Sequence, residues 1–541
     1  MQRFRRLGRA ARVVAMAAAV SVAAGPARVG GALADDQHIQ TTTPIEHIVV
    51  IFQENVSFDH YFGTYPFAAN TDGTTFTAAE DTPSVNGLGA LLTNNPNAGN
   101  PANGANAINP FRLSHSQATT CDQNHDYGPE QAAFDLGLMD AFPVTLGVGT
   151  ATCIDYGKGK GLVMGYYDGN TTTAYWNYAQ HFAMSDNSYD TTFGPSTPGA
   201  LNLISGQTGG VIATGNGPSV PLKPRPVPPD EVTGTTVTGD PQPYGDVCST
   251  RDQARLQGPN IGDLLNAKGV SWGFFQGGFD LTKMNPNGTT GCNRSHSASG
   301  GLGTKGDYIP HHEPFQYYAS TSNLMHARPT VPPSQYGTSA DTVTNHQYDS
   351  DDFFAALNAG NLPEISFLKA PGYQDGHAGY SDPLLEQVFV VNAVNAIMTS
   401  KFWEDTAIII AYDDSDGWYD HQMSPIINSS VTSEDKLTAP GKCGNGTPLK
   451  DAHGVAIQGR CGYGPRQPLV VISPFAKANF VDHSITDTSS ILRFIEDNWT
   501  TGQIGGGSFD ALAGSITTMF NFSKASDFGE RRLILDPNTG N

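Results

Sequence analysis

Six short segments of the sequence concentrate the residue types that act in catalysis and metal binding. They are Gln53-Glu54-Asn55, Cys121–Asp126, Phe193–Pro198, His311-His312-Glu313, Gln374–His377 and Asp413–His421. Taken alone, each segment has an ordinary structural explanation, because Asp and Asn often bond the backbone of a turn. The chemistry therefore depends on which of these segments the fold brings together.

Three carboxylates, those of Glu54, Asp413 and Asp414, follow two apolar segments that read as buried strands. If the strands are neighbours, two such carboxylates about 4 Å apart repel by roughly 4 kcal/mol at an effective dielectric constant of about 20. Three of them need a cation, or at least one pKa must rise. Together with the amide oxygen of Asn55, the cluster favours a hard or borderline divalent metal ion, whose identity the sequence leaves open.

The hydroxyl that could act as a nucleophile beside such an ion is that of Ser196. Gly194 and Pro195 favour a tight turn, and a helix is predicted over Pro198–Ile204, so Ser196 is expected near a helix start. Free amides at a helix start can bind phosphate, although a plain Ser/Thr helix cap is the alternative. Ser-His-Asp esterase chemistry is disfavoured because Pro198 replaces the last glycine of a GxSxG elbow.

Short β-branched runs that end in polar residues predict the buried parallel strands that would position these groups. The runs are Ile45–Phe52, Val270–Phe275, Ile365–Leu368, Thr406–Tyr412 and Pro468–Ile472. Helices are predicted over Gly128–Met139, Pro383–Ser400 and Thr488–Trp499, the last with hydroxyl residues placed to cap its start. Alternating strands and helices indicate an α/β fold with a mainly parallel sheet flanked by helices. In such sheets, sites form beyond the carboxyl ends of the strands.

Two stretches, Asn86–Pro110 and Gly215–Asp246, lack periodicity and read as long surface excursions. We expect one domain over residues 35–541, with the region from about 210 to 345 forming a smaller cap over the active site, because long ordered loops are often functional. The alternative is that these stretches are surface loops without such a role.

Residues 1–34 read as a signal peptide for export. A basic start is followed by the apolar run Val13–Ala24 and by Ala32-Leu33-Ala34, a small-residue cleavage site. The run is far shorter than the roughly 20 residues that cross a bilayer, and no later segment has that character, so we expect no integral membrane segment after signal removal. Arg5-Arg6 leaves general and twin-arginine export both open. The mature protein would be secreted or periplasmic.

Six cysteines follow this segment, and in an oxidising compartment they predict three disulfides. Pairing of nearest neighbours would give Cys121–Cys153, Cys248–Cys292 and Cys443–Cys461. No CxxC pair indicates a zinc knuckle or redox motif. The 51 Asp and Glu against 30 Lys and Arg give a net charge of −21, which disfavours nucleic acid as a partner because phosphate backbones are bound by Lys and Arg.

The same segments resemble the motifs of a known family, and in the same order. Residues 53–63, QENVSFDHYFG, resemble the ENxSFDHYFG opening of the bacterial phosphoesterase family, which includes secreted acid phosphatases and phospholipases C. Five further motifs continue the resemblance: DQNH at 122–125, GPSTP at 194–198, HEPF at 312–315, YDD at 412–414 and ISPF at 472–475. Together they span most of the chain beyond the signal segment.

The resemblance implies a core similar to that of the alkaline phosphatase superfamily, one divalent metal ion and a phosphorylated Ser or Thr. The implied metal ligands are Glu54, Asn55, Asp413 and Asp414. The implied catalytic residues are the nucleophile Ser196 and three histidines around the phosphate, His125, His312 and His377. One of them, His312 or His125, would protonate the leaving group. An acidic pH optimum would follow if these histidines must be charged, since their usual pKa is about 6.5.

Within the family, residues 193–206 and 412–421 resemble the acid phosphatase branch more than the phospholipase C branch. The chain also continues only about 40 residues beyond Trp499, short for the added β region of the longer phospholipases C. We therefore expect an acid phosphatase that hydrolyses monoesters through a phosphoserine. A phospholipase C is the alternative, so the bound partner would be a small phosphate ester or a phospholipid head group. A non-catalytic secreted binding protein is the alternative of another class.

Overall fold

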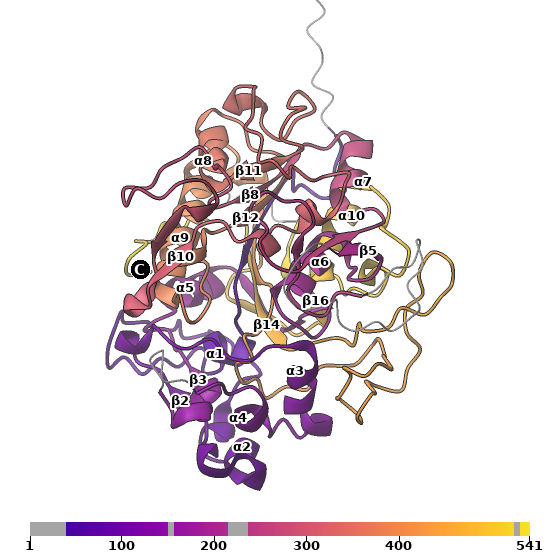
Figure 1. Cartoon of the computed structure of the whole chain (residues 1–541). Coiled ribbons are helices and arrows are strands. Elements are labelled where there is room, and N and C mark those ends of the chain that lie inside the picture. The colour runs from indigo at the N-terminus through magenta and orange to yellow at the C-terminus, as the bar shows by residue number, and fades with distance from the viewer. Residues whose placement is uncertain (1–38, 150–155, 215–235, 524–530) are drawn as a thin grey trace, which may run out of the picture. The chain divides into compact units, whose positions relative to one another are not determined.

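The computed structural model describes residues 39–149, 156–214, 236–523 and 531–541 (Figure 1). The chain divides into two units, Met1–Ile39 and Gln40–Asn541, and every element named below belongs to the second. The predicted signal peptide, residues 1–34, lies outside the described residues. Within the part of the chain that is described, no helix combines the length and apolarity needed to cross a membrane.

The core of the second unit is a nine-stranded sheet in the order β11-β8-β12-β1-β13-β14-β4-β15, with β16 also paired to β4. The strands are β1 (His47–Gln53), β4 (Ala183–Tyr189), β8 (Trp272–Gln276), β11 (Gln347–Asp349), β12 (Ile365–Lys369), β13 (Thr406–Tyr412), β14 (Arg466–Ile472), β15 (Phe480–Asp482) and β16 (Thr486–Asp487). From β11 to β13 the pairs are parallel, whereas β14 is antiparallel to both of its neighbours. The predicted α/β class with a mostly parallel sheet is confirmed.

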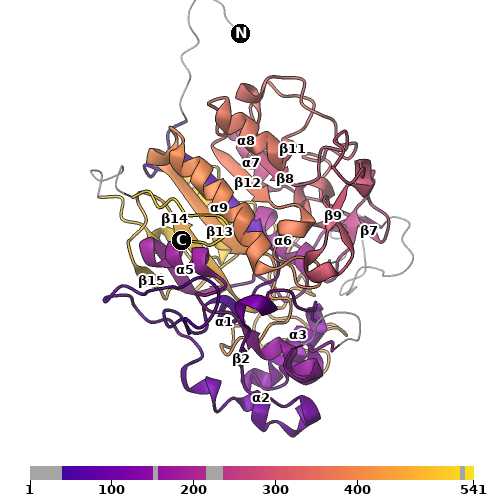
Figure 2. The same cartoon turned by 90° about the vertical axis from the view of Figure 1, so that its left-hand side faces the viewer.

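Helices cover both faces of this sheet, which Figure 1 views close to edge-on. One layer contains α5 (Thr173–His181), α8 (Ser350–Asn358) and α9 (Pro383–Thr399), and α9 contacts both of the others. Figure 2 shows α9 lying across the strands on this face. The other layer contains α6 (Ser196–Ser205), α7 (Ile261–Lys268) and α10 (Ser489–Trp499), and α6 contacts both of the others. Helix α6 therefore belongs to the layer that covers this second face, and its N-terminus faces the carboxyl ends of the strands.

The strongly apolar segments fold as predicted. Strand β13 has the predicted bounds, and all seven of its residues are buried, as expected for a strand covered on both faces. Helix α9 begins at Pro383, and Asp382 caps it by accepting hydrogen bonds from the next two free amides, those of Leu384 and Leu385. Strand β14 was also predicted, but its antiparallel direction follows from the connections and not from its composition.

Two predicted helices differ from the structure at their ends. The segment predicted over Gly128–Met139 is helical as α3 only over Tyr127–Ala133, because Asp135 and Leu136 adopt positive φ values that end the helix. The start of α10 is not capped by its own hydroxyls as expected. Instead, Asp487 Oδ2 accepts the amide of Ser489 at 3.0 Å.

The proposed cap region, about residues 210–345, contributes both to the sheet and to smaller structures. Its strand β8 lies in the central sheet, whereas β5 (Val211–Thr214), β6 (Gln242–Pro243) and β7 (Gln253–Leu256) form a small separate sheet. Strands β9 (Ser295–Ser297) and β10 (Thr304–Gly306) form an antiparallel pair. Part of the stretch 215–246 lies outside the described residues. A role as a cap stays a prediction.

The stretch 86–110 is ordered by its asparagines. It contains the short helix α2 (Pro96–Gly99), whose start is capped by Asn95, and the buried amides of Asn97 and Asn103 bond the backbone of residues 139 and 140. It packs near α4 (Phe142–Thr145) and the two-stranded sheet of β2 (Phe111–Arg112) and β3 (Gly165–Tyr166). The hydrogen bonds of these Asn side chains hold the stretch in place, although its sequence lacks the apolar periodicity of a helix or strand.

Two of the three predicted disulfides are confirmed. Cys248 is bonded to Cys292, and Cys443 is bonded to Cys461. Cys121 is also disulfide-bonded, and its predicted partner Cys153 lies outside the described residues.

Candidate active site

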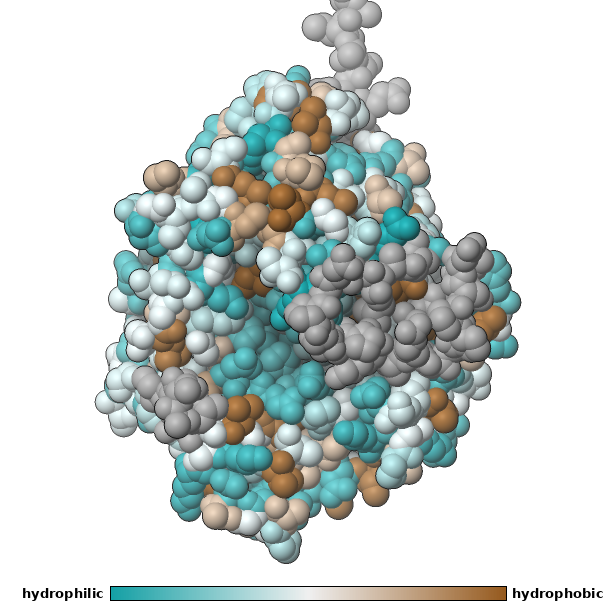
Figure 3. All heavy atoms as spheres, viewed as in Figure 1, coloured by the Kyte–Doolittle hydropathy of each residue, from teal (hydrophilic) through white to brown (hydrophobic). Residues whose placement is uncertain are grey.

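The predicted carboxylate cluster forms where β1 and β13 end. The two strands are parallel neighbours, with Gln53 opposite Tyr412, so the residues that follow leave the sheet at the same edge. Helix α1 (Phe58–Phe62) begins a few residues after β1. The face shown in Figure 3 is hollowed close to the position of α1 in Figure 1, and hydrophilic side chains gather around the hollow. Four predicted ligands are buried at this edge: Glu54, Asn55, Asp413 and Asp414.

Ser196 is the first residue of α6, and its hydroxyl reaches this cluster. The buried Oγ lies 3.0 Å from Asp414 Oδ2 and 3.2 Å from Glu54 Oε2. The close approach depends on Gly199, because a Cβ at that position would lie 1.9 Å from the backbone oxygen of Asp413. The structure therefore brings the predicted nucleophile to the predicted metal ligands.

One amide in the first turn of α6 already has an acceptor. The backbone N–H of Thr197 donates to Asp240 Oδ1 at 2.9 Å. A carboxylate at this place satisfies one of the donors that a helix start leaves without an intrahelical partner. Asp240 therefore occupies one of the amides at the helix start that could otherwise bind a phosphate oxygen.

Asn55 meets the requirements of a metal ligand. Its φ of 58° lies in the left-handed region, which Asn enters more readily than most residues. Its side-chain amide is buried, and neither the oxygen nor the nitrogen has a hydrogen-bond partner among the described residues. An unsatisfied buried polar group costs about 1–3 kcal/mol, and a cation would satisfy the oxygen. The set of carboxylate, amide and hydroxyl oxygens fits a divalent ion.

Lys369, the last residue of β12, is a member of the cluster that sequence analysis missed. Its ammonium is buried and forms ion pairs with Glu54 and with Asp413, whose Oδ2 lies 3.1 Å from Nζ. Burial opposes the charge, but Asp413 and Glu54 outweigh it and raise the pKa of Lys369. The sequence could have indicated Lys369. The predicted strand ends at Leu368, and the residue after a strand parallel to β1 lies at the same edge of the sheet as Glu54.

Asp413 is the predicted ligand that accepts two backbone amides. Its Oδ1 accepts the backbone amides of Asn55 at 3.2 Å and Asp414 at 2.9 Å, and its Oδ2 faces Lys369. Burial raises the pKa of Asp414 to about 7, while the nearby charge of His125 opposes the rise. Asp413 thus orders the cluster, and Asp414 is the carboxylate that meets the Ser196 hydroxyl.

His312 contacts the cluster directly. It belongs to the single helical turn Pro310–His312, and its Nδ1 lies 3.0 Å from Glu54 Oε1. Burial lowers its pKa to about 3, although Glu54 opposes the change. A neutral imidazole still donates one N–H, so His312 holds Glu54 without carrying charge. Potential ligand atoms of Glu54, His312 and Asp375 lie within 4.8 Å of one another, so this buried group could also hold a metal ion.

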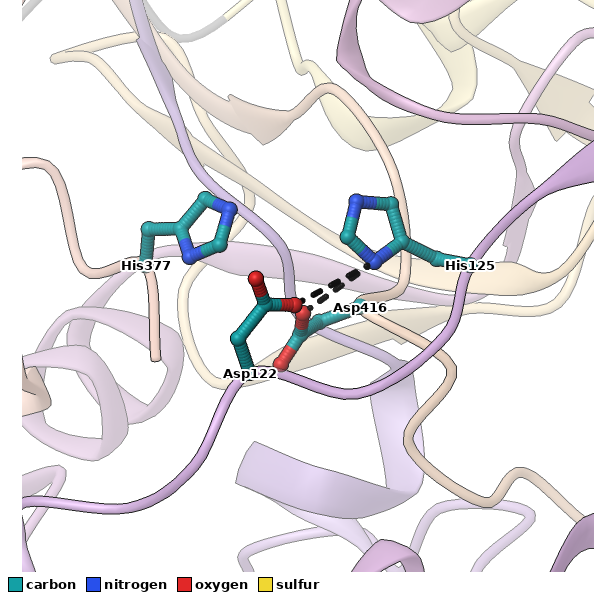
Figure 4. A group of neighbouring side chains, drawn as sticks. All are labelled: Asp122, His125, His377 and Asp416. Atoms are coloured by element: carbon teal, nitrogen blue, oxygen red, sulfur yellow. Dashed lines mark ion pairs between the residues drawn. The ribbon is translucent and has the colours of Figure 1, made fainter. Parts of the chain in front are cut away.

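His125 and His377 lie together in a second group with Asp122 and Asp416 (Figure 4). Nδ1 of His125 lies 2.8 Å from the Gln123 carbonyl, 3.3 Å from Asp416 Oδ1 and 3.7 Å from Asp122 Oδ1. The second ring nitrogen points away from both carboxylates (Figure 4). Because a carbonyl only accepts, Nδ1 carries a proton and donates it.

The two histidines of this group differ in charge. Burial would lower the pKa of His125, but Asp414, Asp416 and Asp122 outweigh it and raise the pKa well above its usual value. Burial lowers the pKa of His377, whose Nδ1 bonds the Ala378 carbonyl at 2.6 Å. The ring centroids of His125 and His377 are 5.9 Å apart. If the phosphate must meet charged histidines, His125 alone among the three predicted residues fits that condition, because burial lowers the pKa of both His312 and His377.

Glu130, a residue of α3, links two segments of the site and was missed in the sequence. Its carboxylate accepts the amide of Gly194 at 2.9 Å and the hydroxyl of Ser415 at 2.7 Å. It thereby ties the turn before Ser196 to the residue after Asp414. Burial raises the pKa of Glu130 to about 8. Only its place in a predicted helix was visible in the sequence, because both partners are distant along the chain.

A family model described as "Phosphoesterase family" matches residues 45–501, which include every residue of the site described above. The chain belongs to the phosphoesterase family. The resemblance of its six motifs is thereby confirmed at the level of the family. Five of the motifs contribute to the segments that meet at the site, whereas ISPF follows the antiparallel strand β14 and lies at the other edge of the sheet, where Ser473 Oγ donates to the carbonyl of Thr406. The candidate site is thus built from residues at the ends of β1, β12 and β13, from the start of α6, and from α3 and the turn Pro310–His312.

Curated relatives of this phosphoesterase include phospholipases C. The chain is 24% identical over 529 residues to the non-hemolytic phospholipase C of Pseudomonas aeruginosa, covering 94% of the chain and 62% of the relative. It is 26% identical over 499 residues to phospholipase C A of Mycobacterium tuberculosis, covering 89% of the chain and 78% of the relative. The chain therefore spans about 60% of the length of the Pseudomonas relative.

A solved structure of a protein in the alkaline phosphatase superfamily from Vibrio parahaemolyticus matches 78% of the chain, and the match covers 79% of that protein at 11% identity and a TM-score of 0.25.

Proposed function

We propose that the protein is a secreted, metal-dependent phosphoesterase of the phospholipase C type, with Ser196 as its nucleophile. The contact of the Ser196 hydroxyl with both Asp414 and Glu54 carries the proposal. The phospholipase C relatives favour a phosphodiester of a phospholipid head group over the monoester that sequence analysis preferred. The acid phosphatase reading becomes the second candidate, supported by the resemblance of residues 193–206 and 412–421.

The proposed first step is attack of Ser196 Oγ on phosphorus with departure of the alcohol. The hydroxyl proton has an acceptor in place, because Asp414 Oδ2 lies 3.0 Å away. The attacking oxygen sits at the start of α6, where the helix dipole favours developing negative charge. A phosphoserine results, which for a diester substrate still carries the head group on its phosphorus, and water hydrolyses its bond to Ser196 in a second step. Positioning and charge stabilisation account for most of the acceleration in phosphoryl transfer.

We propose Glu54, Asn55 and Asp414 as the main ligands of one divalent ion. Asp413 is the fourth predicted ligand, but its oxygens already accept two amides and face Lys369, so its main role would be to order the cluster. The unpartnered amide of Asn55 is the observation that supports an ion here. When bound, such an ion would supply positive charge that stabilises the serine alkoxide and the phosphoryl oxygens.

We propose His125 as the acid that protonates the leaving oxygen. It is the one of the three predicted histidines whose surroundings raise its pKa, and Nδ1 is held by the Gln123 carbonyl and by Asp416. The other ring nitrogen is then free to donate. Such a positioned acid is worth about 10²–10⁴-fold in rate. His312 and His377 would act as neutral groups beside the phosphate.

A comparison of two chromogenic esters tests this function. Hydrolysis of p-nitrophenyl phosphorylcholine, a diester, supports the phospholipase C type, and hydrolysis of p-nitrophenyl phosphate alone supports the acid phosphatase. Each should require Ser196 and a divalent ion. Hydrolysis of neither ester and of no phosphatidylinositol vesicle, with or without added Mg²⁺, Mn²⁺, Zn²⁺ or Ca²⁺, would contradict both and favour a non-catalytic binding protein on the same fold.

We also propose an extracytoplasmic location. The disulfides Cys248–Cys292 and Cys443–Cys461 are of a kind that persists in oxidising compartments. Detection of the protein in the culture medium or periplasm of its host, with its N-terminus near residue 35, would test this directly.

A further inference from the structure

Two cations near the site have no carboxylate partner. The protein is strongly acidic, with a net charge of −21, and most of its buried or half-buried cations are ion-paired. Arg112, Arg294, Arg328, Lys369 and Arg466 all contact Asp or Glu. Among the described residues, by contrast, neither Arg251 nor Lys305 forms an ion pair. Two cations without a direct ion pair, in an otherwise acidic protein, are a place where an external anion would be favoured.

Lys305 approaches the site through Tyr380. It lies on β10, and its Nζ is 3.4 Å from the centroid of the Tyr380 ring. That ring stacks on His377 at 4.4 Å, and its hydroxyl donates to Asp375 Oδ2 at 3.1 Å. The Tyr380 ring thus lies between Lys305 and His377, one of the predicted catalytic histidines.

Arg251 approaches the site through His311. Its Nη2 donates to His311 Nδ1 at 3.2 Å, so His311 is a neutral acceptor. The ring of His311 lies 4.5 Å from that of His312, which contacts Glu54. The Arg251 side chain is exposed, so its remaining donors can reach a ligand from solvent.

The two cations act on each other. Burial lowers the pKa of Lys305, and the charge of Arg251 adds to this, while Asp375, Glu54 and Asp122 oppose it. The same two charges act on His311, because burial lowers its pKa and the charges of Arg251 and Lys305 add to the change. An anion placed between Arg251 and Lys305 would relieve this repulsion and gain charge-assisted hydrogen bonds.

We propose that Arg251 and Lys305 form a subsite for a second phosphate group, carried by the substrate in addition to the scissile one. The proposal rests on the proposed function, because it needs a scissile phosphate at Ser196. The planar guanidinium suits two phosphate oxygens at once, and the ammonium adds a point charge. The source of this phosphate is either a phosphorylated lipid head group or a soluble bisphosphate, which share the same chemistry.

The same geometry disfavours a choline head group at this place. Quaternary ammonium groups are bound over the faces of aromatic rings. Here the Tyr380 ring is already covered by Lys305 at 3.4 Å and by His377 at 4.4 Å. A cationic head group would also meet the like charges of Arg251 and Lys305. The subsite therefore selects an anionic group on the substrate over a cationic one.

Matched pairs of substrates test the subsite. The lipid pair is vesicles of phosphatidylinositol with and without the 4-phosphate, and the soluble pair is propane-1,3-diol bisphosphate and propyl phosphate. In the wild type, kcat/KM should favour the ester with the second phosphate by about tenfold to a hundredfold in at least one pair, the range of one or two charged hydrogen bonds. The pair that shows the preference identifies the source of the phosphate.

The double variant R251Q/K305Q should lose that preference. The matched control is R255Q/K401Q, which also removes one Arg and one Lys. Both of these residues lie over aromatic rings, those of Tyr244 and Phe402. The control should keep the preference. A wild type without preference in either pair, or a preference that survives in R251Q/K305Q, would overturn the subsite.

Binding separates this inference from the proposed function. Titration calorimetry of both soluble esters against the Ser196→Ala protein measures the subsite without turnover. The bisphosphate should bind about tenfold or more tightly than propyl phosphate, and adding R251Q/K305Q should abolish the difference. If the wild type hydrolyses no ester at all, the proposed function fails. Equal binding of the two esters to the Ser196→Ala protein would overturn the subsite, whether or not the wild type is active.

Discussion

Lys369 Nζ lies 3.1 Å from Asp413 Oδ2 in a fully buried ion pair to which Glu54 also belongs. A lysine fixed at the end of β12 thus balances part of the negative charge that gathers beyond β1 and β13. The remaining carboxylate of Asp414 and the amide of Asn55 keep the character of a cation site. The cluster therefore contains one fixed cation, the ammonium of Lys369, and oxygen ligands suited to a second cation that can exchange with solvent.

Replacement of Lys369 by Met should destabilise the protein. Removal of one partner of a buried pair leaves the other charge uncompensated, which costs about 3–5 kcal/mol. We expect the free energy of unfolding, from denaturant titration without added metal, to fall by that amount. The control Lys401→Met removes an exposed ammonium and should change it by less than about 0.5 kcal/mol. A similar loss in both variants would contradict a special role for the Lys369 pair.

Ser196→Ala should abolish turnover and leave the fold intact. The hydroxyl is small and its neighbours are Asp414 and Glu54, so stability should change by no more than about 1 kcal/mol, the usual net value of a hydrogen bond. The neighbouring Thr197→Ala is the control, because its hydroxyl lies 3.5 Å from the Pro241 carbonyl and also bonds the Tyr317 side chain, while the carboxylates of the cluster bond Ser196. Initial rates with p-nitrophenyl esters measure both. Activity retained in Ser196→Ala and lost in Thr197→Ala would move the nucleophile by one residue.

Asn55→Gly should weaken metal binding with little effect on the protein without metal. Glycine tolerates the φ of 58°. Removing a buried amide that has no partner among the described residues should stabilise the protein, and the greater backbone entropy of glycine in the unfolded chain should destabilise it by a similar amount. The rise in Tm with metal concentration reports the affinity, which should fall about tenfold or more.

Asn70→Gly is the matched control for this change. Asn70 has a φ of 53°, but its amide bonds Phe76 through both Nδ2 and Oδ1. It should therefore lose about 1–3 kcal/mol of stability and keep its metal affinity. Unchanged metal affinity in Asn55→Gly would remove Asn55 from the ligand set.

Glu130 should make stability fall as pH rises. Burial raises its pKa from 4.5 to about 8, so the folded protein holds this proton more tightly than the unfolded chain does. The stabilisation is complete below about pH 4.5 and is lost as pH rises toward 8, by up to about 1.4 kcal/mol per unit. Glu130→Gln cannot ionise and should lose this part of the dependence in urea titrations at pH 5 and 8.5. The exposed Glu80→Gln should behave as the wild type.

His125→Gln should lower kcat most for esters of poor leaving groups. An acid helps an alkoxide far more than it helps p-nitrophenolate, so the loss should approach about 10²–10⁴-fold for an alkyl ester and be much smaller for the chromogenic one. The exposed His453→Gln serves as the control. Equal losses for both esters would assign His125 to binding of the phosphate instead of proton transfer.

The sequence by itself determined the strands β1 and β13 and the residues that end them. Each is a continuous apolar run, a pattern that only a strand buried on both faces needs, and each stops at acids. Because parallel strands present their carboxyl ends at one edge, the meeting of Glu54 with Asp413 could be predicted without coordinates. Strand β4, with the polar sequence AMSDNSY, could not, since its polar groups are buried with partners from distant segments such as Arg466.

Only the tertiary structure decided the order of the strands and the charges of the site. The order β12-β1-β13 placed Lys369 against Glu54, and no local pattern encodes which strand lies beside which. The three histidines look alike in the sequence, yet His125 is held charged by three carboxylates and His312 is made neutral by burial. Residue type and spacing determine what chemistry a group can perform, whereas its protonation state depends on solvent exposure and on neighbours that are hundreds of residues away in the chain.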